Sequence, residues 1–405
     1  MHKTIIVGMQ IGLFGKANVG KSTFFSAATQ TSVKIENFPF TTIKPNVGIA
    51  YVNTTCACKH FKIKHNNPLC ISGIRFVPVK LIDVAGLVPG AHEGKGLGNQ
   101  FLDDARQAEV LIHVVDISGS TDIQGQSVNV GTHDPREDIK FAEEEFDFWF
   151  KQILEREWQK LSKEIEKTKT KLVDAIADRF SGLGVKVNHV HEVLQNLGLL
   201  TKKPVEWNNS DLTKFAQMLR KKTKPMLIAA NKADLCKSLE ITNEIHKNRE
   251  IINCSAETEL LLKKAAKADL IEYIPGNEKF VINKNVDISA PQKAALNLVE
   301  NVLSKLNSTG VQTALNSAVF RVLKLIIVFP VEDETKLSNK DGEILPDAKI
   351  LSENATARNL AEVIHQDIAK GFLYAIDVKT KQRIGADHQL KNGDVIKIVS
   401  SLSRG

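Results

Sequence analysis

The chain has 405 residues, of which 42% are hydrophobic and 25% are charged, and its formal net charge is +7. This length is enough for two or three domains with cores of their own, and the composition is that of an ordinary soluble protein. A membrane-spanning protein is excluded, because charge or proline interrupts the longest apolar stretches well short of the roughly 20 residues that a spanning helix needs.

Two further features bear on compartment and partners. The start of the chain lacks the small-residue cleavage site of a secretory leader, and the five cysteines form no regular framework, so we expect a cytoplasmic protein. The positive charge permits contact with phosphate-rich partners and is by itself only a weak indication of RNA binding.

The first predicted element is a strand over Gln10–Phe14, followed directly by "GKANVGKS". A strand, this spacing and then a helical run are the context of a phosphate-binding P-loop. In such a loop backbone N–H groups surround the phosphates, Lys21 reaches the β- and γ-phosphates, and Ser22 offers a hydroxyl to Mg²⁺. The residues expected to bind nucleotide here are Gly15, Lys16, Ala17, Asn18, Val19, Gly20, Lys21, Ser22 and Thr23.

The next feature is a group of cysteines and histidines, "CACKHFKIKHNNPLC", inside an apparent insertion. Cys56, Cys58, His65 and Cys70 could form a tetrahedral zinc site, with His60 as the other option for the histidine ligand. The spacing is not that of a standard zinc knuckle, so unliganded loop residues are the alternative. A metal here would be structural, because no ligand position is obviously open.

The strand predicted over Val77–Asp83 leads into "DVAGL". Asp83 is placed like a carboxylate that holds Mg²⁺ through water, and Gly86 can offer its N–H to a γ-phosphate. Leu87 stands where Ras-like enzymes have a water-orienting glutamine, and an aliphatic side chain can neither orient water nor accept its proton. Intrinsic turnover should therefore be slow. His92, further along the loop, could act as a base only if a partner orders it; a solvent-exposed histidine is the alternative.

More than a hundred residues separate the strands predicted at Val110–Asp116 and Lys224–Ala230, and their sequence pattern is helical and not strand-like. Apolar residues recur at helical spacing from Glu143 to Phe180, which predicts long amphipathic helices. The basic cluster Leu219–Lys224 could be a solvated helix face or an RNA contact. Strands that alternate with helices predict a parallel sheet covered on both faces, and an insertion of this size predicts a separate helical subdomain.

The motif "NKAD", Asn231 to Asp234, follows an apolar strand and bears on base identity. A carboxylate at Asp234 can accept two hydrogen bonds from guanine, whereas adenine offers no matching pair and would leave it unsatisfied. The tripeptide "CSA" could complete the base pocket. The residues expected to bind the base are Asn231, Lys232, Asp234, Ser255 and Ala256.

The last part of the chain changes to short strands around one helix. The runs Ala318–Phe329, Phe372–Lys379 and Asp394–Ser400 predict strands. A helix is predicted over Thr356–Lys370, with Thr356 as N-cap and Gly371 ending it. These elements predict a small α+β module.

Three runs together closely resemble the Obg group of translation-factor-related GTPases, near its YchF subfamily: "GKANVGKSTFF", "NFPFTTIKPNVG" and "DVAGLVPGAHEGKGLGNQFLDDARQA". The run from Leu345 to Ser400 resembles a TGS domain, a ubiquitin-like β-grasp module. The similarity covers most of the chain, and the helical insertion matches in position more than in motif.

The resemblance implies roles for several residues. Thr42 matches the switch I threonine that coordinates Mg²⁺ when a γ-phosphate is present, with Thr41 as the fallback. Asn18 matches the P-loop asparagine of potassium-activated GTPases, although its amide could equally tie down its own loop. YchF proteins typically carry glutamate at the position of Asp234 and favour ATP, so this chain is expected to prefer GTP. The expected catalytic residues are Asn18, Lys21, Thr42 and Gly86, and the expected Mg²⁺ ligands are Ser22, Thr42 and Asp83.

The predicted fold class is α/β: a P-loop GTPase domain with an inserted α-helical subdomain and a C-terminal β-grasp TGS domain of α+β type. The expected division assigns residues 1–118 and 225–315 to the GTPase domain, with an insertion at 52–76 that could bind metal. The helical domain takes residues 119–224, and the TGS domain takes residues 316–405.

The leading hypothesis for function is a switch that hydrolyses GTP to GDP and phosphate and engages a ribosome or other RNA through its helical insertion and TGS domain. The expected cofactors are GTP or GDP and Mg²⁺, with K⁺ and structural Zn²⁺ as further options; no membrane partner is expected, and the chain could be a monomer. The alternatives are a YchF-like ATPase in stress regulation, and a nucleotide-gated binding protein in which hydrolysis is incidental.

Overall fold

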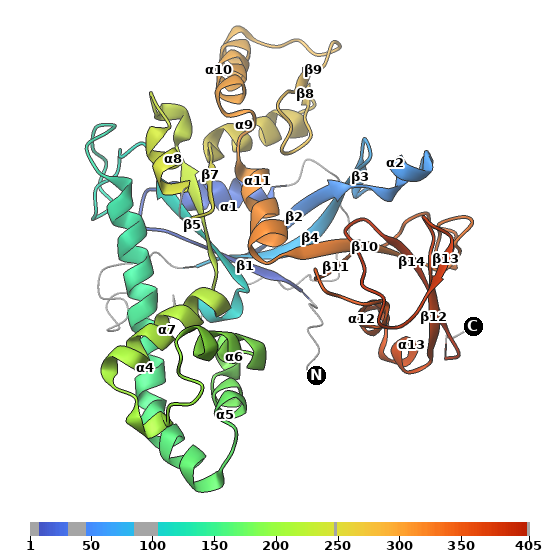
Figure 1. Cartoon of the computed structure of the whole chain (residues 1–405). Coiled ribbons are helices and arrows are strands. Elements are labelled where there is room, and N and C mark those ends of the chain that lie inside the picture. Colours follow the sequence, from blue (N-terminus) through green and yellow to red (C-terminus); the bar gives the residue numbers. More distant parts are fainter. Residues whose placement is uncertain (1–7, 31–45, 85–103, 247–248, 403–405) are drawn as a thin grey trace.

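A computed structural model of the chain describes residues 8–30, 46–84, 104–246 and 249–402. Figure 1 shows two sheets: one near the middle of the molecule and another in a C-terminal unit beside it, with a group of helices extending away from the central sheet. In the described part of the chain, no helix is both long and apolar enough to cross a membrane.

The central sheet has seven strands, in the order β2-β4-β1-β5-β6-β7, with the short β3 paired to β4. β1, β4, β5, β6 and β7 run parallel, whereas β2 and β3 are antiparallel to β4. The predicted parallel sheet is therefore confirmed for its central strands. The bounds are β1 Gln10–Phe14, β2 Val47–Thr55, β3 Cys70–Ile71, β4 Ile74–Asp83, β5 Val110–Asp116, β6 Met226–Asn231 and β7 Ile251–Asn253.

Register brings the carboxyl ends of the parallel strands to one edge of this sheet. Leu13 pairs with Asp83, and Asp116 pairs with Asn231. The polar residues that follow these buried strands therefore collect at the same edge, where open parallel sheets bind their ligands. Helices cover both faces: one core contains α1 and α11 side chains, and another contains side chains of α4. The helices near this sheet are α1 Lys21–Thr29, α8 Glu240–His246, α9 Ala256–Lys267, α10 Ala290–Leu306 and α11 Val311–Ser317.

The smaller elements around the central sheet are local. β8 and β9 form a two-stranded sheet of their own, next to a core shared by α9 and α10. The bounds are α2 Ala57–Phe61, η4 Ala233–Leu235, β8 Ile271–Glu272 and β9 Val281–Ile282.

Four α-helices form the lobe between β5 and β6. The first, α4, is 34 residues long and begins with Asp134 as N-cap, whose carboxylate accepts a hydrogen bond from the Arg136 backbone N–H. The sequence predicts helices from Glu143 to Phe180. In the structure the first of them, α4, begins earlier, at Pro135, and ends at Thr168. The rings of Trp158 in α4, Trp207 just after η3 and Phe215 in α7 pack together in the lobe's core. The bounds are α4 Pro135–Thr168, α5 Leu172–Arg179, η2 Ser181–Leu183, α6 Val187–Asn196, η3 Pro204–Glu206 and α7 Asn209–Thr223.

Two members of the basic cluster at the end of α7 have structural roles. Arg220 is buried and pairs with Asp147 of α4, with its Nε 2.7 Å from Oδ1. Lys224 is buried as well, and its ammonium donates to the backbone carbonyls of Arg106 and Ala108. Arg220 thus joins two helices of the lobe, and Lys224 joins the end of the lobe to the segment that precedes β5, so neither residue belongs to a solvated face or a surface for RNA.

The C-terminal sheet has five strands, in the order β11-β10-β14-β12-β13. β10 and β14 are parallel and the other pairs are antiparallel, with a core between the sheet and α12. The α+β module is therefore confirmed. The bounds are β10 Leu325–Val331, β11 Lys349–Ser352, α12 Ala357–Ile364, α13 Gln366–Lys370, β12 Phe372–Asp377, β13 Gln382–Ile384 and β14 Val395–Ser400.

Two predictions for this module need correction. Ala318–Val322, predicted as the start of a strand, is a π-helical turn that continues α11, because Ala318 and Val319 are buried in the core of the central sheet. The helix predicted over Thr356–Lys370 is broken at His365, whose backbone is extended with φ −166° and ψ 142°. Thr356 as N-cap is confirmed, since its hydroxyl accepts from the Asn359 N–H.

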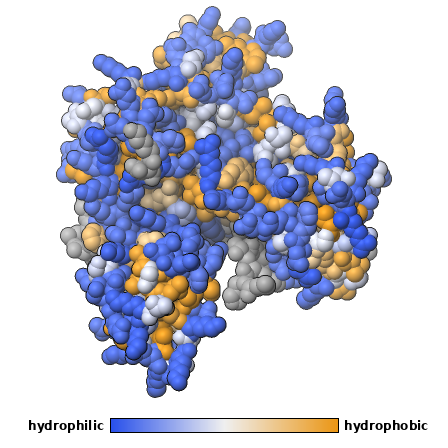
Figure 2. Space-filling view, viewed as in Figure 1, coloured by the Kyte–Doolittle hydropathy of each residue, from blue (hydrophilic) through white to orange (hydrophobic). Residues whose placement is uncertain are grey.

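Figure 2 shows one face of the molecule that is largely hydrophilic, with hydrophobic residues gathered over the lower helical lobe. Phe148 of α4 is half exposed, and Val187 and Leu200 in the same lobe are also exposed. Exposed apolar side chains are common on protein surfaces.

Candidate nucleotide-binding site

The P-loop turns tightly between β1 and α1 at the carboxyl edge of the sheet. Gly20 has φ 88°, and a Cβ built on it would lie 2.3 Å from the Asn231 amide nitrogen. A Cβ on Gly15 would lie 2.5 Å from the Val114 carbonyl oxygen. Both positions therefore require glycine, because the loop backbone lies directly against its neighbours.

Lys21 and Asp83 meet at this edge. Lys21 is the first residue of α1 and Asp83 the last of β4, and the Lys21 ammonium pairs with the Asp83 carboxylate. Ser22, the next residue of α1, is exposed. A helix N-terminus with a lysine and a carboxylate beside it offers N–H donors and a cation for phosphates, and oxygen ligands of the kind Mg²⁺ prefers.

Asn231 connects the P-loop to the loop after β7. Its amide nitrogen donates to the Val19 carbonyl oxygen at 2.9 Å, and its amide oxygen accepts from the Ala256 N–H at 3.0 Å. Asn231 is buried, as are Ser255 and Ala256. The predicted phosphate and base segments are thus brought together by one side chain.

Asp234 lies in the short η4 turn, where it is half-buried. Within the described residues, no hydrogen bond to its carboxylate is formed. The turn's backbone is held instead by Lys305 of α10, whose ammonium donates to the carbonyls of Ala233 and Asp234 at 3.3 and 3.4 Å and to that of Cys236. Lys305 fixes the turn from 71 positions away, so this contact has no local signal in the sequence.

Asp116, at the end of β5, is a buried carboxylate with four side-chain donors. Lys232 donates at 2.8 Å, Ser118 at 2.5 Å and Ser120 at 2.7 Å, and Thr121 donates as well. Burial by itself raises the pKa of the Asp116 carboxyl, but these hydrogen bonds outweigh it and hold the pKa below its usual value. Asp116 therefore fixes Lys232 of the "NKAD" motif beside the loop that follows β5.

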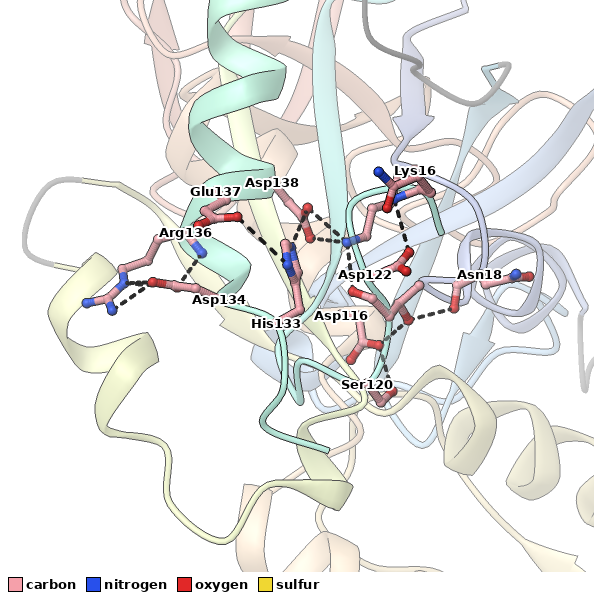
Figure 3. A network of polar contacts seen from close by, with 12 residues as sticks. Lys16, Asn18, Asp116, Ser120, Asp122, His133, Asp134, Arg136, Glu137 and Asp138 are labelled. Carbon is pink, nitrogen blue, oxygen red and sulfur yellow. Dashed lines mark hydrogen bonds and ion pairs between the residues drawn. The ribbon is translucent and has the colours of Figure 1, made fainter. Parts of the chain in front are cut away.

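That loop, residues 117–134, also contacts the P-loop, as Figure 3 shows. The ammonium of Lys16 donates to the Thr121 carbonyl and to Asp138 of α4, both at 2.9 Å. His133 contacts the same Asp138 carboxylate at 2.9 Å. The Asn18 amide donates to the Gly125 carbonyl at 2.8 Å. The amide of Asn18 therefore ties the P-loop to another loop, and not to its own.

Several predicted residues fall outside the described part of the chain. These are Thr41, Thr42, Gly86, Leu87 and His92. Their proposed roles in Mg²⁺ binding, γ-phosphate sensing and water activation remain predictions from the sequence.

The predicted zinc ligands are brought together beyond the carboxyl end of β2, away from the P-loop. The ligand atoms of Cys56, Cys58, His65 and Cys70 all lie within 4.8 Å of one another. His60, the alternative ligand, is exposed and contacts the ring of Phe61.

These features define a P-loop GTPase with a TGS domain. They are the P-loop on a parallel sheet, the "NKAD" turn at the end of β6, the helical lobe and the β-grasp module. Family models match three parts of the chain: 50S ribosome-binding GTPase at residues 10–145, the G4 motif-containing domain of YGR210-like Obg-like GTPases at 229–333, and the TGS domain at 342–400.

Known proteins match almost the whole chain. An uncharacterised GTP-binding protein of Methanocaldococcus jannaschii is 45% identical over an alignment of 396 positions, which covers 96% of this chain and 99% of the relative. A GTP-binding protein from Pyrococcus horikoshii has a crystal structure with a TM-score of 0.78 and 41% identity, covering 97% of this chain and 100% of that one. A ribosome-binding ATPase YchF of Buchnera aphidicola is 25% identical over an alignment of 413 positions, which covers 97% of this chain and 99% of the relative. The chain belongs to the Obg-like, YchF-related family of P-loop nucleoside triphosphate hydrolases.

Proposed function

We propose that the protein is a GTP-hydrolysing switch, converting GTP to GDP and phosphate. The observation that carries this proposal is the side chain of Asn231, which joins the P-loop to the segment at Ala256 and lies in the same motif as the guanine-type carboxylate of Asp234. Guanine presents two N–H donors to such a carboxylate, whereas adenine presents none in that arrangement. Residues 15–23 would hold the phosphates through backbone N–H groups and Lys21, and Lys232, Ser255 and Ala256 would complete the base pocket.

The chemistry rests on positioning and charge. Ser22, Asp83 and Thr42 are proposed to hold Mg²⁺, which when bound neutralises charge on the β- and γ-phosphate oxygens. Lys21 would bind the same oxygens and Gly86 would sense the γ-phosphate. Intrinsic turnover is expected to be slow, because Leu87 cannot orient the attacking water.

We propose that Asn18 helps a monovalent cation to complete this site. Its amide nitrogen is engaged by the Gly125 carbonyl, and this hydrogen bond leaves the amide oxygen available as a ligand for K⁺. The cation would supply positive charge in addition to that of Lys21, because the other P-loop lysine, Lys16, is already paired with Asp138. The Cys₃His group is proposed to bind Zn²⁺.

The proposed partner is a ribosome or ribosomal RNA. Support comes from the family model named for 50S ribosome binding, from the relative named as a ribosome-binding ATPase, and from the net charge of +7. The proposed division is a GTPase domain at 1–118 and 225–315, a helical domain at 119–224 and a TGS domain at 316–405, of which the last two would engage the partner. A cytoplasmic monomer is part of the same proposal.

The test is hydrolysis of GTP and ATP by the purified full chain, with Na⁺ or K⁺ as the monovalent cation and with or without ribosomes. We expect a preference for GTP and stimulation by K⁺ or ribosomes. Equal use of ATP would contradict the guanine assignment and favour the YchF-like ATPase. GTP binding without stimulation by either addition would favour a nucleotide-gated binding protein.

Asp234→Asn provides a matched variant. An amide can accept from only one of guanine's donors, and its N–H group can donate to the 2-carbonyl of xanthine. We expect GTP binding on the order of 10- to 100-fold weaker and a gain in XTP binding, measured by calorimetry. Asp269→Asn, at a position with no assigned role, is the control. Unchanged GTP affinity in Asp234→Asn would contradict the assignment.

A further inference from the structure

Four potential metal ligands converge at the far end of β2 and β4, away from the P-loop. Cys56 precedes α2 and Cys58 lies in it, while His65 is in the loop that follows and Cys70 is on β3. Cys56 and Cys58 are buried, and all five cysteines are free thiols. The distance of 3.9 Å between the Cys58 and Cys70 sulfurs is nearly twice a disulfide bond.

The spacing of the ligand atoms is close to that of a tetrahedral zinc site. Zn–S bonds of about 2.3 Å and a Zn–N bond of about 2.0 Å place sulfurs about 3.8 Å apart, and sulfur and nitrogen about 3.5 Å apart. The observed distances are 3.9 Å between Cys58 and Cys70 sulfurs and 3.6 Å between Cys56 Sγ and His65 Nε2. Coordination through Nε2 leaves the imidazole proton on Nδ1, so the 3.3 Å contact from the Asn67 N–H to Nδ1 must open when metal binds.

A buried cation beside the group supplies independent support. Arg75 pairs with Cys70 in the β3–β4 register and is only 1% exposed. Its Nε and Nη1 find no hydrogen-bond partner anywhere in the described ranges. A guanidinium buried in this way is costly without a counter-charge. Three thiolates and a neutral imidazole around Zn²⁺ carry a net charge of −1 and provide sulfur acceptors next to Arg75.

The same segment holds the C-terminal domain. Arg75 Nη2 donates to the carbonyl oxygens of Leu345 and Pro346 at 2.7 and 2.9 Å. The Asn67 amide, between His65 and Cys70 in the chain, donates to the same two oxygens at 3.1 and 3.2 Å. Leu345 is itself fully buried in a core that continues from the central sheet into the C-terminal sheet.

We propose that Cys56, Cys58, His65 and Cys70 bind a structural Zn²⁺ that locks the TGS domain onto the GTPase domain. With four protein ligands the site is closed, so the metal has no position for substrate. It fixes the short segment from Cys56 to Arg75, and that segment presents Asn67 and Arg75 to the turn at Leu345–Pro346. Metal loading thereby sets how firmly this TGS turn is held.

Metal content of the purified full chain, measured by plasma mass spectrometry, tests the site. We expect close to one zinc per chain, and visible absorption typical of tetrahedral thiolate coordination after replacement by Co²⁺. His65→Ala and Cys70→Ser should lose the metal, whereas His60→Ala should keep it, because His60 is exposed in the same loop. A chain that takes up no zinc or cobalt, or a His65→Ala variant that retains zinc like the parent, would overturn the site.

Hydrogen–deuterium exchange over residues 342–349 tests the lock. Removing zinc from the parent chain with a chelator should make exchange there on the order of tenfold faster, and adding zinc back should reverse this. Asn67→Asp keeps the acceptor used by the Leu69 N–H but removes the donor to the TGS turn, so it should retain zinc and still exchange faster. Zinc loss with unchanged exchange at 342–349 would overturn the lock. GTP binding, measured alongside, reports separately on the proposed function.

Discussion

His113 is a buried imidazole on β5, and its ring stacks on the ring of Phe14 with centroids 4.5 Å apart. Burial lowers the pKa of His113 to about 3, from an ordinary value of 6.5. Between these values the unfolded chain binds more protons than the folded one, so stability falls as pH is lowered from 6.5 toward 3. For His113→Phe we expect a pH dependence shallower by about 1.4 kcal/mol per pH unit between pH 6 and 4, measured by urea unfolding.

The exposed His60 provides the control for this prediction. His60→Phe changes the same kind of residue without removing a buried imidazole, so its pH dependence should match that of the parent chain. An identical slope in His113→Phe would mean that His113 is protonated in the folded state.

At the scale of elements, the first turn of α4 is held against the P-loop by a buried ion pair. Lys16 and Asp138 are 8% and 4% exposed, and their closest atoms lie 2.8 Å apart. Asp138→Ala leaves the Lys16 ammonium buried without its carboxylate, so we expect a loss of about 3 to 5 kcal/mol in the free energy of unfolding. Asp134→Ala, which removes the α4 N-cap and a more exposed pair with Arg136, should cost about 1 kcal/mol in the same urea titration. Equal losses in the two variants would contradict the assignment.

The elements that could be predicted from the sequence are those specified locally. The strand at Gln10–Phe14, the P-loop and the Thr356 cap follow from neighbouring residues, and the zinc ligands could be proposed because they lie within 15 positions of one another. The pairing of Lys16 with Asp138 joins residues 122 positions apart and has no local signal. Ala318–Val322 has the apolar character of a strand, but packing against the central sheet makes it helical.

At the scale of the whole molecule, the C-terminal sheet includes a strand that lies before the start of the TGS family match. That match begins at residue 342, whereas β10 ends at Val331 and lies between β11 and β14. A fragment of residues 342–405 would lack this inner strand and expose two unpaired strand edges. We expect this fragment to be unfolded by circular dichroism or aggregated in gel filtration. A fragment of residues 323–405 should show the circular dichroism spectrum of a folded protein and elute as a single compact species. A folded 342–405 fragment would show that β10 is dispensable.

The contact between the P-loop and the first turn of α4 gives that helix the geometry of a lever. Its 34 residues span about 50 Å, with Asp138 near one end and the helical lobe packed along the rest. If events at the phosphates tilt the helix by about 5°, its far end moves by about 4 Å. A small rotation of α4 at its Lys16 end would therefore become a displacement of several ångströms at the far end of the helical lobe.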